Sequence, residues 1–213
     1  MPTTWTTTSW GVVVPVKRLA VAKSRLASFG PVTRTQLALA FAADVVTACL
    51  ACDGVRIVLV VTDDQVAARE LSALGARWAP DLPGAGLNPA LRHGVRLLRA
   101  ELGDCGVIAV SSDLPALRTA DLAQVLGAVP RGQRAFVSDA SAEGTTVLAA
   151  GVGAPLDPAY GAGSRRRHLA SGAAELAGTP ALRRDVDTPE DLREALLLGV
   201  GRHTTRITTP PAS

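Results

Sequence analysis

Apolar runs, rich in valine and isoleucine, recur along the chain and predict buried strands. A run without polar alternation is typical of a strand that is covered on both faces. Three runs are strong, at residues 10–16 (WGVVVPV), 56–62 (RIVLVVT) and 106–111 (GVIAVS). Shorter strand candidates lie at 77–79, 134–139 and 145–150.

Helical spacing of apolar residues fills most of the segments between these runs. The predicted helices span 33–52, 64–74, 89–102, 119–129, 164–171 and 189–198. Strands that alternate with helices over short connections predict an α/β fold with a single-domain, doubly wound, mostly parallel sheet. We expect this domain to cover residues 9–199, and we expect the Thr- and Pro-rich ends, 1–8 and 200–213, to be disordered.

The composition predicts a cytoplasmic protein that acts on small ligands. Of the 213 residues 47% are hydrophobic but only 3% are aromatic, so we expect a core of small aliphatic side chains. No apolar run reaches the roughly 20 residues that span a bilayer, and the N-terminus lacks the pattern of a secretory signal. The net charge of +3 is too small to indicate a nucleic-acid surface. We therefore expect neither a membrane nor a nucleic acid as a partner.

The cysteine pattern does not favour a metal or redox site. Cys49 and Cys52 form a C-x-x-C pair, but a structural zinc site needs four ligands, and no second pair lies nearby. Cys52 also continues the apolar stripe of the predicted helix 33–52. We expect the Cys52 thiol to pack in the core.

Basic side chains gather in the loop that follows the first strand. Ligands of open α/β sheets bind beyond the carboxyl ends of the strands, and Lys17, Lys23 and Arg25 follow such an end. The loop contains neither G-x-G-x-x-G nor G-x-x-x-x-G-K-[ST], so it is neither a dinucleotide fingerprint nor a P-loop. Lysine and arginine suit the phosphates of a nucleotide, although a solvated basic loop would have the same pattern.

Acidic residues occupy two further segments. Asp113 comes directly after the strand 106–111, where a carboxylate either holds a divalent cation or forms a turn before Pro115. Asp185 and Asp187 are two residues apart, so in an extended segment both point to the same side. Two carboxylates on one face repel each other unless a cation lies between them, and these residues are therefore candidate metal ligands.

The residues that follow Asp187 have a structural explanation. Thr188 and Pro189 fit the cap and first position of a helix, and Glu190 and Asp191 complement its dipole. We expect them to start the helix 189–198 and not to take part in chemistry.

Other polar residues are candidates for substrate contacts: Asn88, which we expect to contact a nucleotide, Thr145, Thr146, and the Gly-rich turn from Gly161 to Ser164. Free backbone N–H groups in such a turn make a natural anion site, but an ordinary loop-to-helix junction has the same pattern. His168 lies among arginines, and we expect it to be a surface or substrate-adjacent residue rather than a catalytic one.

Taken in order, these segments resemble one enzyme family. The chain is similar to the phosphoenolpyruvate or 2-phospho-L-lactate guanylyltransferases of coenzyme F-420 biosynthesis. The similar segments are, in order, VVVPVKRLAVAKSRL, GLNPAL, SSDLPAL, GTTVL, YGAGS and RRDVDTPEDL. The resemblance covers roughly residues 10–200. S-x-D-L-P and D-x-D-T-P-E-D-L also occur in molybdenum-cofactor nucleotidyltransferases, so the joint order, together with the basic first loop, carries the resemblance.

The resemblance implies a Rossmann-like, glycosyltransferase-A-like fold of the nucleotide-diphospho-sugar transferase type. GTP and a phosphorylated three-carbon acid would be the substrates, and a diphosphate-linked guanosine and pyrophosphate the products. Mg²⁺ is the implied cofactor, and Asp113, Asp185 and Asp187 match the metal-binding and catalytic positions. Gly161, Ser164 and one of Thr145 and Thr146 match the acceptor site. Since the first loop lacks the glycines of related sugar nucleotidyltransferases, the resemblance leaves the triphosphate contacts open.

Several alternatives stay open at the level of the sequence. The Ala- and Arg-rich composition suits an actinobacterium, in which phosphoenolpyruvate rather than phospholactate is the expected acceptor. A molybdenum-cofactor-type nucleotidyltransferase, a glycosyltransferase that consumes a nucleotide-sugar, and a non-catalytic nucleotide-binding protein are the other interpretations. A homodimer and an association with the downstream transferase of the same pathway are also open.

The expected mechanism is an in-line attack of the acceptor phosphate on the α-phosphorus of the nucleotide. A phosphate monoester has a second pKa of about 6, so the acceptor is already a dianion near neutral pH and needs no general base. The task is to overcome the repulsion between two anions, which a metal ion and the basic loop are suited to do.

Overall fold

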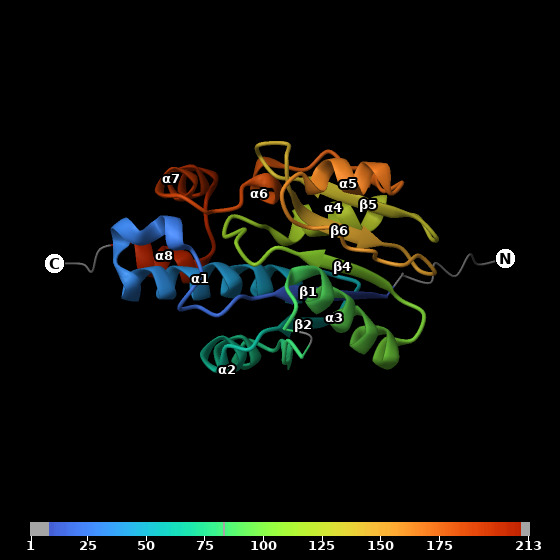
Figure 1. The fold of residues 1–213 in the computed structure, drawn as a ribbon, viewed down its shortest axis with the longest axis horizontal. Coiled ribbons are helices and arrows are strands. Elements are labelled where there is room, and N and C mark those ends of the chain that lie inside the picture. The colour runs from blue at the N-terminus through green and yellow to red at the C-terminus, as the bar shows by residue number, and fades with distance from the viewer. Residues whose placement is uncertain (1–8, 83, 210–213) are drawn as a thin grey trace.

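One seven-stranded sheet runs through the molecule in the order β3-β2-β1-β4-β6-β5-β7 (Figure 1). The computed structural model describes residues 9–82 and 84–209. The strands are β1 (Trp10–Pro15), β2 (Val55–Val61), β3 (Arg77–Ala79), β4 (Gly106–Val110), β5 (Arg134–Ser138), β6 (Thr145–Ala150) and β7 (Ala174–Glu175).

The pairing of the strands brings the ends of β1, β4 and β6 together. β3, β2, β1 and β4 are parallel neighbours. β6 is antiparallel to both β4 and β5, and β7 is parallel to β5. The loops after β1 and β4 therefore leave the sheet at the same edge, and the antiparallel β6 begins at that edge. The predicted mostly parallel α/β sheet is confirmed.

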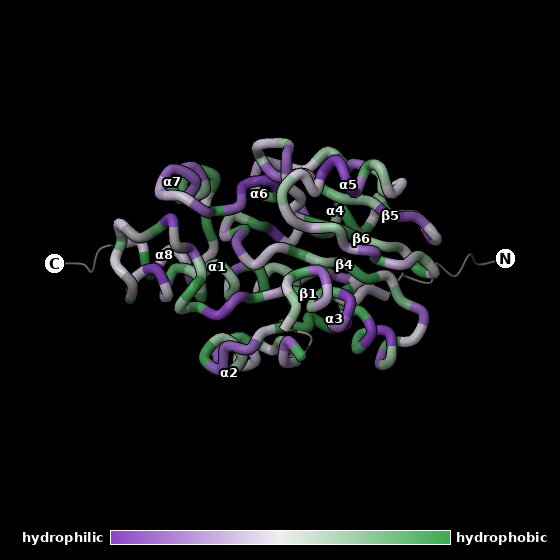
Figure 2. Tube along the Cα trace, in the orientation of Figure 1, coloured by the Kyte–Doolittle hydropathy of each residue, from purple (hydrophilic) through white to green (hydrophobic). Residues whose placement is uncertain are grey.

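Helices cover both faces of the sheet. One face carries α1 (Pro31–Leu50), α2 (Gln65–Ala73), α4 (Thr119–Ala128) and α6 (Pro180–Arg183). The other carries α3 (Leu87–Leu102) and α5 (Ser164–Ala170). Figure 2 shows hydrophobic stretches along the central strands and a hydrophilic outer stretch on α5. Burial on two faces explains why the strands are continuous apolar runs.

A third group of elements packs at one end of α1. It consists of the 3₁₀ helix η1 (Ser24–Phe29), α7 (Pro189–Leu198) and α8 (Arg202–Thr208). Leu26 of η1, Phe41 of α1 and Leu192 of α7 share a small apolar cluster with Val186. This cluster fixes the two segments that flank it, the basic first loop and the acidic segment 185–187, at the same end of the molecule.

α3 lies unusually close to the sheet at Gly94. A Cβ atom at this position would come within 2.8 Å of a Val13 methyl group and 3.0 Å of a Val61 methyl group. Any larger residue would push the helix away from β1 and β2. The glycine therefore sets the position of α3, whose first turn borders the pocket described below.

All predicted strands and helices are present, with ends shifted by at most two residues. α1 begins at Pro31 rather than at Thr33, which fits the preference of proline for the first helical position. The elements that the pattern did not predict are η1, β7, α6 and α8. All four are short, so their hydrophobic periodicity is too brief to distinguish them from loops.

The C-terminal segment differs from the predicted disordered tail, because residues 202–208 form α8. The buried carboxylate of Asp44 in α1 accepts hydrogen bonds from the backbone N–H groups of His203 and Thr204, each at 2.9 Å. These contacts satisfy the first turn of α8 and dock it on α1, as Figure 1 shows. The predicted disorder of residues 1–8 and 210–213 falls outside the described residues.

The structure also shows where the cysteines lie and whether any helix could span a membrane. Cys49, Cys52 and Cys105 are free and buried, and burial raises the pKa of each thiol. This placement agrees with the core role predicted for Cys52. In the described part of the chain, no helix combines the length and apolar character that a membrane span requires.

Candidate active site

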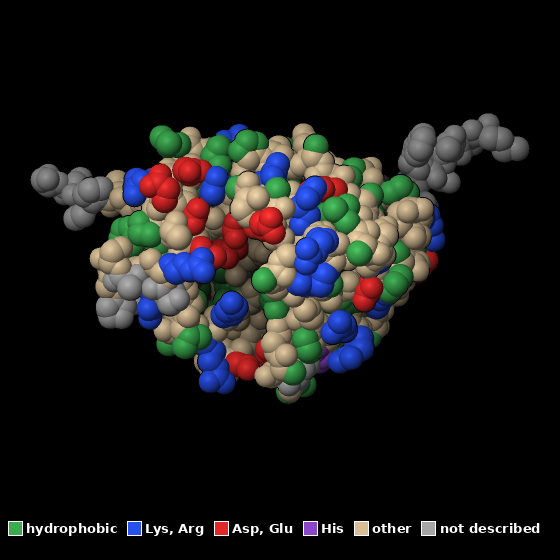
Figure 3. All heavy atoms as spheres, turned by 45° about the horizontal axis from the view of Figure 1, so that its top comes forward, with side chains coloured by type: hydrophobic (Ala, Val, Ile, Leu, Met, Phe, Trp, Pro, Cys, Tyr) green, Lys and Arg blue, Asp and Glu red, His purple; other side chains and the backbone are tan. Residues whose placement is uncertain are grey.

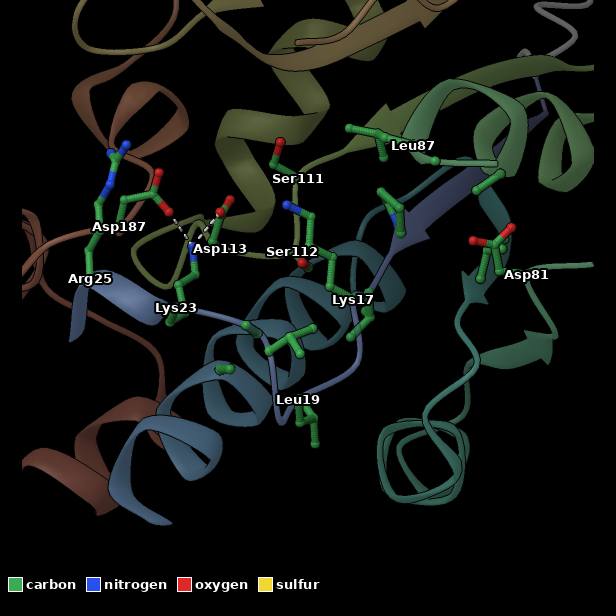
Figure 4. Close-up of a pocket in the computed structure, with 18 residues that line it drawn as sticks. Lys17, Leu19, Lys23, Arg25, Asp81, Leu87, Ser111, Ser112, Asp113 and Asp187 are labelled. Atoms are coloured by element: carbon green, nitrogen blue, oxygen red, sulfur yellow. Dashed lines mark hydrogen bonds and ion pairs between the residues drawn. The ribbon is translucent and has the colours of Figure 1, made fainter. Parts of the chain in front are cut away.

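A pocket of about 500 Å³ opens where β1 and β4 end. Figure 3 shows the molecule hollowed on this face, with acidic side chains along one wall and basic side chains at the rim. Its lining comes from the first loop, the start of α3 and both acidic segments, and includes Lys17, Leu19, Lys23, Arg25, Asp81, Leu87, Ser111, Ser112, Asp113 and Asp187 (Figure 4).

The basic first loop is held in place by specific hydrogen bonds. Asp64, the N-cap of α2, accepts the backbone N–H of Leu19 at 2.8 Å through one carboxylate oxygen. Its other oxygen accepts the N–H groups of Val66 and Ala67. Arg34 of α1 donates to the Ala20 carbonyl at 2.8 Å. The loop is therefore anchored to two helices before it reaches Lys23.

Lys23 lies between two carboxylates that are far apart in the sequence. Its Nζ atom donates to Asp113 Oδ2 at 2.6 Å and to Asp187 Oδ1 at 2.8 Å (Figure 4). Only 10% of its side chain is exposed. Burial opposes the charged form of this lysine, but the two carboxylates outweigh burial, so its pKa is raised. The backbone of Lys23 adopts a left-handed conformation, with φ of 54°.

The two acidic segments are joined through the backbone. The N–H of Val186, which is fully buried, donates to the Asp113 carbonyl at 3.0 Å. Asp185 and Asp187 thus flank the residue that contacts the Asp113 backbone. Burial, together with the negative charges of Asp113 and Asp187, raises the pKa of Asp185 to about 7. Asp113 and Asp187 therefore meet at Lys23, and Asp185 lies next to this pair.

A capping box fixes the far end of the acidic segment. Thr188 and Asp191 bond each other's backbone N–H groups at the start of α7, and Asp191 also accepts the N–H of Asp187 at 3.2 Å. Arg184 donates to Asp191 at 3.1 Å. Thr188 and Asp191 therefore have the structural role that the sequence predicted.

The two threonines at the start of β6 have different surroundings. The Thr146 hydroxyl is buried and donates to the Leu182 carbonyl at 2.7 Å. Thr145 points instead toward α5, where its hydroxyl is 3.1 Å from Ser164 Oγ and 2.9 Å from His168 Nδ1. Because the N–H of Ser111 donates to the Thr146 carbonyl at 2.9 Å, both threonines lie beside the segment that leads to Asp113.

The Gly-rich turn before α5 is anchored on several sides. Asn88 of α3 accepts the Tyr160 N–H at 2.8 Å and donates to the Tyr160 carbonyl at 3.1 Å. Arg167 donates to the Ala159 carbonyl at 3.0 Å. Gly161, with φ of 119°, occupies a backbone region that favours glycine. These contacts hold the turn in place next to Ser164.

The structure thus groups the predicted site residues in two clusters. The first cluster lines the pocket and consists of Lys17, Lys23, Arg25, Asp113 and Asp187, with Asp185 beside them. Thr145, Gly161 and Ser164 form a second group around α5. Asn88 holds the second group through the Tyr160 backbone, and the Thr146 hydroxyl donates to the Leu182 carbonyl of α6.

Sequence reasoning missed other residues that shape the site. Asp64 was assigned only to a helix start, although it also anchors the first loop. Asp81 lies at the end of the pocket remote from Asp187 (Figure 4). Its place in a Pro- and Gly-rich loop gave no periodic signal. His168, expected near the surface or the substrate, is fully buried; only its position four residues after Ser164 links it to this helix face.

Several solved structures share this fold. A nucleotidyl transferase from Methanothermobacter superposes with a TM-score of 0.65 at 22% sequence identity, covering 89% of this chain and 97% of that one. A 4-diphosphocytidyl-2C-methyl-D-erythritol synthase superposes with a TM-score of 0.59 at 13% identity, covering 90% and 99%. The fold is thus of the nucleotide-diphospho-sugar transferase type that the resemblance implied.

Sequence comparison defines the family more closely. Residues 10–208 match the family described as guanylyl transferase CofC like, and the chain belongs to this family. A phosphoenolpyruvate guanylyltransferase from Thermomonospora curvata is 56% identical over 198 residues, which cover 92% of this chain and 87% of the relative. A phosphoenolpyruvate guanylyltransferase from Streptomyces avermitilis is also 56% identical, with 92% of each chain covered. The chain is therefore a nucleotidyltransferase, and the molybdenum-cofactor, glycosyltransferase and non-catalytic alternatives are set aside.

Proposed function

We propose that this enzyme transfers GMP from GTP to phosphoenolpyruvate and releases pyrophosphate. The product would be enolpyruvoyl-2-diphospho-5'-guanosine, an intermediate of coenzyme F-420 biosynthesis. The observation that carries the proposal is the convergence of Lys23, Asp113 and Asp187 at a pocket of nucleotide size, in a chain that is 56% identical to enzymes with this name.

Mg²⁺ is the proposed cofactor, and the donor set fits it in part. Within the described ranges, no three His, Cys, Asp or Glu side chains are arranged as a metal site. Asp113 and Asp187 nevertheless share one cation, the Lys23 ammonium. Mg²⁺ commonly binds one or two carboxylates and completes its shell with water and phosphate oxygens. We assign Asp113 and Asp187 as its ligands, with Asp185 as a further ligand. A bound Mg²⁺ would neutralise charge on the phosphates.

The pocket suits a purine nucleoside triphosphate. Its apolar lining, which includes Leu19 and Leu87, can cover a base, and Lys17 and Arg25 can neutralise phosphates. Asp81 lies at the end remote from the carboxylate pair. Its carboxylate can accept hydrogen bonds from the N–H groups of guanine, whereas adenine offers a different pattern of donors. We therefore favour GTP as the nucleotide.

The acceptor is assigned to the second cluster. Thr145 and Ser164 present hydroxyl groups next to the Gly161 turn, and hydroxyl donors suit the oxygens of a phosphorylated acid. Of the two threonines we assign Thr145, because the Thr146 hydroxyl donates to a backbone carbonyl. The acceptor phosphate would attack as a dianion, so the residues of the site need only to hold and align two anions.

We further propose that the reaction takes place in the cytoplasm, where both substrates would be available. A homodimer and an association with the next transferase of the pathway stay predictions.

A product assay tests the proposal. The purified enzyme is incubated with GTP and Mg²⁺ together with either phosphoenolpyruvate or 2-phospho-L-lactate, and the products are measured by mass spectrometry. We expect the guanosine diphosphate adduct of phosphoenolpyruvate and one pyrophosphate for each adduct. ATP and CTP in place of GTP are the matched controls. An adduct with phospholactate alone would contradict the assigned acceptor, and no adduct with either acid would contradict the proposed function.

A further inference from the structure

A fully buried histidine stands directly behind the proposed acceptor site. His168 is on α5, one helical turn after Ser164, and its side chain has no exposed surface. Its ring packs against Phe136, with ring centroids 5.6 Å apart, and edge-on against Tyr160, with centroids 5.4 Å apart. The ring is thus confined by neighbours and cannot reach solvent without moving them.

The hydrogen bonds of His168 define which nitrogen carries the proton. The backbone N–H of Ala159 donates to Nε2 at 3.0 Å, so Nε2 is an acceptor and bears no proton. The neutral ring therefore carries its proton on Nδ1. Nδ1 is 2.9 Å from Thr145 Oγ1 and must act as the donor in that contact. Burial, with a smaller effect of Arg134 and Arg167, lowers the pKa of His168 to about 4, in keeping with a neutral ring.

The Thr145 oxygen then receives two hydrogen bonds. One comes from His168 Nδ1, and the other from Ser164 Oγ at 3.1 Å. A hydroxyl oxygen has two acceptor positions and one proton to donate. With both acceptor positions filled, the Thr145 hydroxyl can act only as a donor. Among the residues that the structure describes, none accepts this proton.

We propose that His168 is a positioning residue that fixes the Thr145 hydroxyl as a hydrogen-bond donor toward an anionic oxygen of the acceptor. This inference rests on the proposed function, because it requires Thr145 to contact the acceptor. A hydroxyl that is free to rotate also samples orientations in which its lone pairs face the anion, and these repel it. Fixing the donor removes these orientations before the substrate binds.

Two conservative variants separate this role from simple packing. Asn in place of His168 keeps an amide N–H near the position of Nδ1 and loses the acceptor for Ala159. Gln in place of His168 reaches the position of Nε2, so it keeps an acceptor for Ala159 and loses the donor to Thr145. If His168 only anchored the 159–160 turn, Gln would be the better replacement; if it positions Thr145, Asn is.

The experiment measures KM for phosphoenolpyruvate, KM for GTP and kcat in His168→Asn, His168→Gln and Thr145→Val, together with the double variant Thr145→Val/His168→Gln. Thr145→Val should raise KM for phosphoenolpyruvate about tenfold or more, since a hydrogen bond to a charged group is lost. His168→Gln should raise this KM in a similar way with KM for GTP unchanged, and His168→Asn should stay within about threefold of the unaltered enzyme. The double variant should be no worse than Thr145→Val alone.

The outcomes test separately the assignment of the acceptor site and the positioning role of His168. If Thr145→Val leaves KM for phosphoenolpyruvate unchanged, the assignment of the acceptor site is wrong. If Thr145→Val raises it but His168→Gln does not, or His168→Asn is the worse replacement, the positioning role is wrong.

A measurement on the unaltered enzyme covers the case in which a variant fails to fold. Nitrogen-15 NMR of the histidine side chains should show His168 with a proton on Nδ1 and none on Nε2. Addition of phosphoenolpyruvate should shift the Nδ1 proton. A proton on Nε2, or no shift at saturating phosphoenolpyruvate, would overturn the inference.

Discussion

At the scale of single residues, Lys23 and its two carboxylates are the centre of the site. The sequence predicted Lys23 and Asp113 as phosphate and metal contacts by their positions after predicted strands, and Asp187 as a metal ligand by its spacing from Asp185. It did not predict that the lysine itself would lie between the two carboxylates, because a contact between residues separated by 90 and 164 positions leaves no local pattern. A metal ion bound as proposed would therefore compete with the lysine for the same oxygens.

This competition predicts how Mg²⁺ affects stability. Lys23→Met removes the counter-ion of two partly buried carboxylates, and we expect the free energy of unfolding to fall by about 1–2 kcal/mol. Mg²⁺ should then raise the melting temperature of Lys23→Met more than that of the unaltered protein, because the cation no longer has to displace the ammonium. Differential scanning calorimetry with and without Mg²⁺ measures both effects.

Lys17→Met is the matched control, since Lys17 lines the same pocket but is exposed at its rim. It should respond to Mg²⁺ as the unaltered protein does. An equal Mg²⁺ response in all three proteins would show that Lys23 and the metal ion do not share a position.

At the scale of secondary-structure elements, those that are buried along their length could be predicted from the hydrophobic pattern of the sequence. β1, β2 and β4 are covered on both faces and read as uninterrupted apolar runs. α8 gave no such signal, because it is short and its first turn is held by a buried carboxylate, Asp44, of a helix that ends about 150 residues earlier in the chain. A short element that is held by distant polar contacts cannot be found from hydrophobic periodicity.

The docking of α8 leads to a prediction about Asp44. Asp44→Ala removes the acceptor of one buried and one partly buried backbone N–H group, which we expect to lower the free energy of unfolding by about 2–3 kcal/mol. α8 should detach first, so trypsin should cleave after Arg202 and Arg206 faster than in the unaltered protein. Timed digestion followed by mass spectrometry measures these cleavages. Asp53→Ala, at an exposed site after α1, is the control. Unchanged protection of both arginines in Asp44→Ala would mean that Asp44 does not hold α8.

At the scale of the whole molecule, the sheet topology assembles the site. The loop after β1, the segment after β4 and the segment before α7 are distant in the chain, and parallel pairing together with the Val186 contact brings them to one edge. The general rule for open α/β sheets predicted that Lys23 and Asp113 lie at this edge, and the place of Asp187 beside them was implied by the family resemblance. The roles of Asn88 and His168 were not predictable, since each depends on which backbone groups of the 159–160 turn come within reach.

The most direct test of the account is Mg²⁺-dependent pyrophosphate release from GTP and phosphoenolpyruvate in Asp113→Asn and Asp187→Asn, with the exposed Asp53→Asn as the control and circular dichroism to verify folding. We predict that each site variant loses at least about 10²-fold in kcat while it stays folded, and that Asp53→Asn keeps full activity. Near-full, Mg²⁺-dependent turnover in a folded Asp113→Asn or Asp187→Asn enzyme would contradict the account.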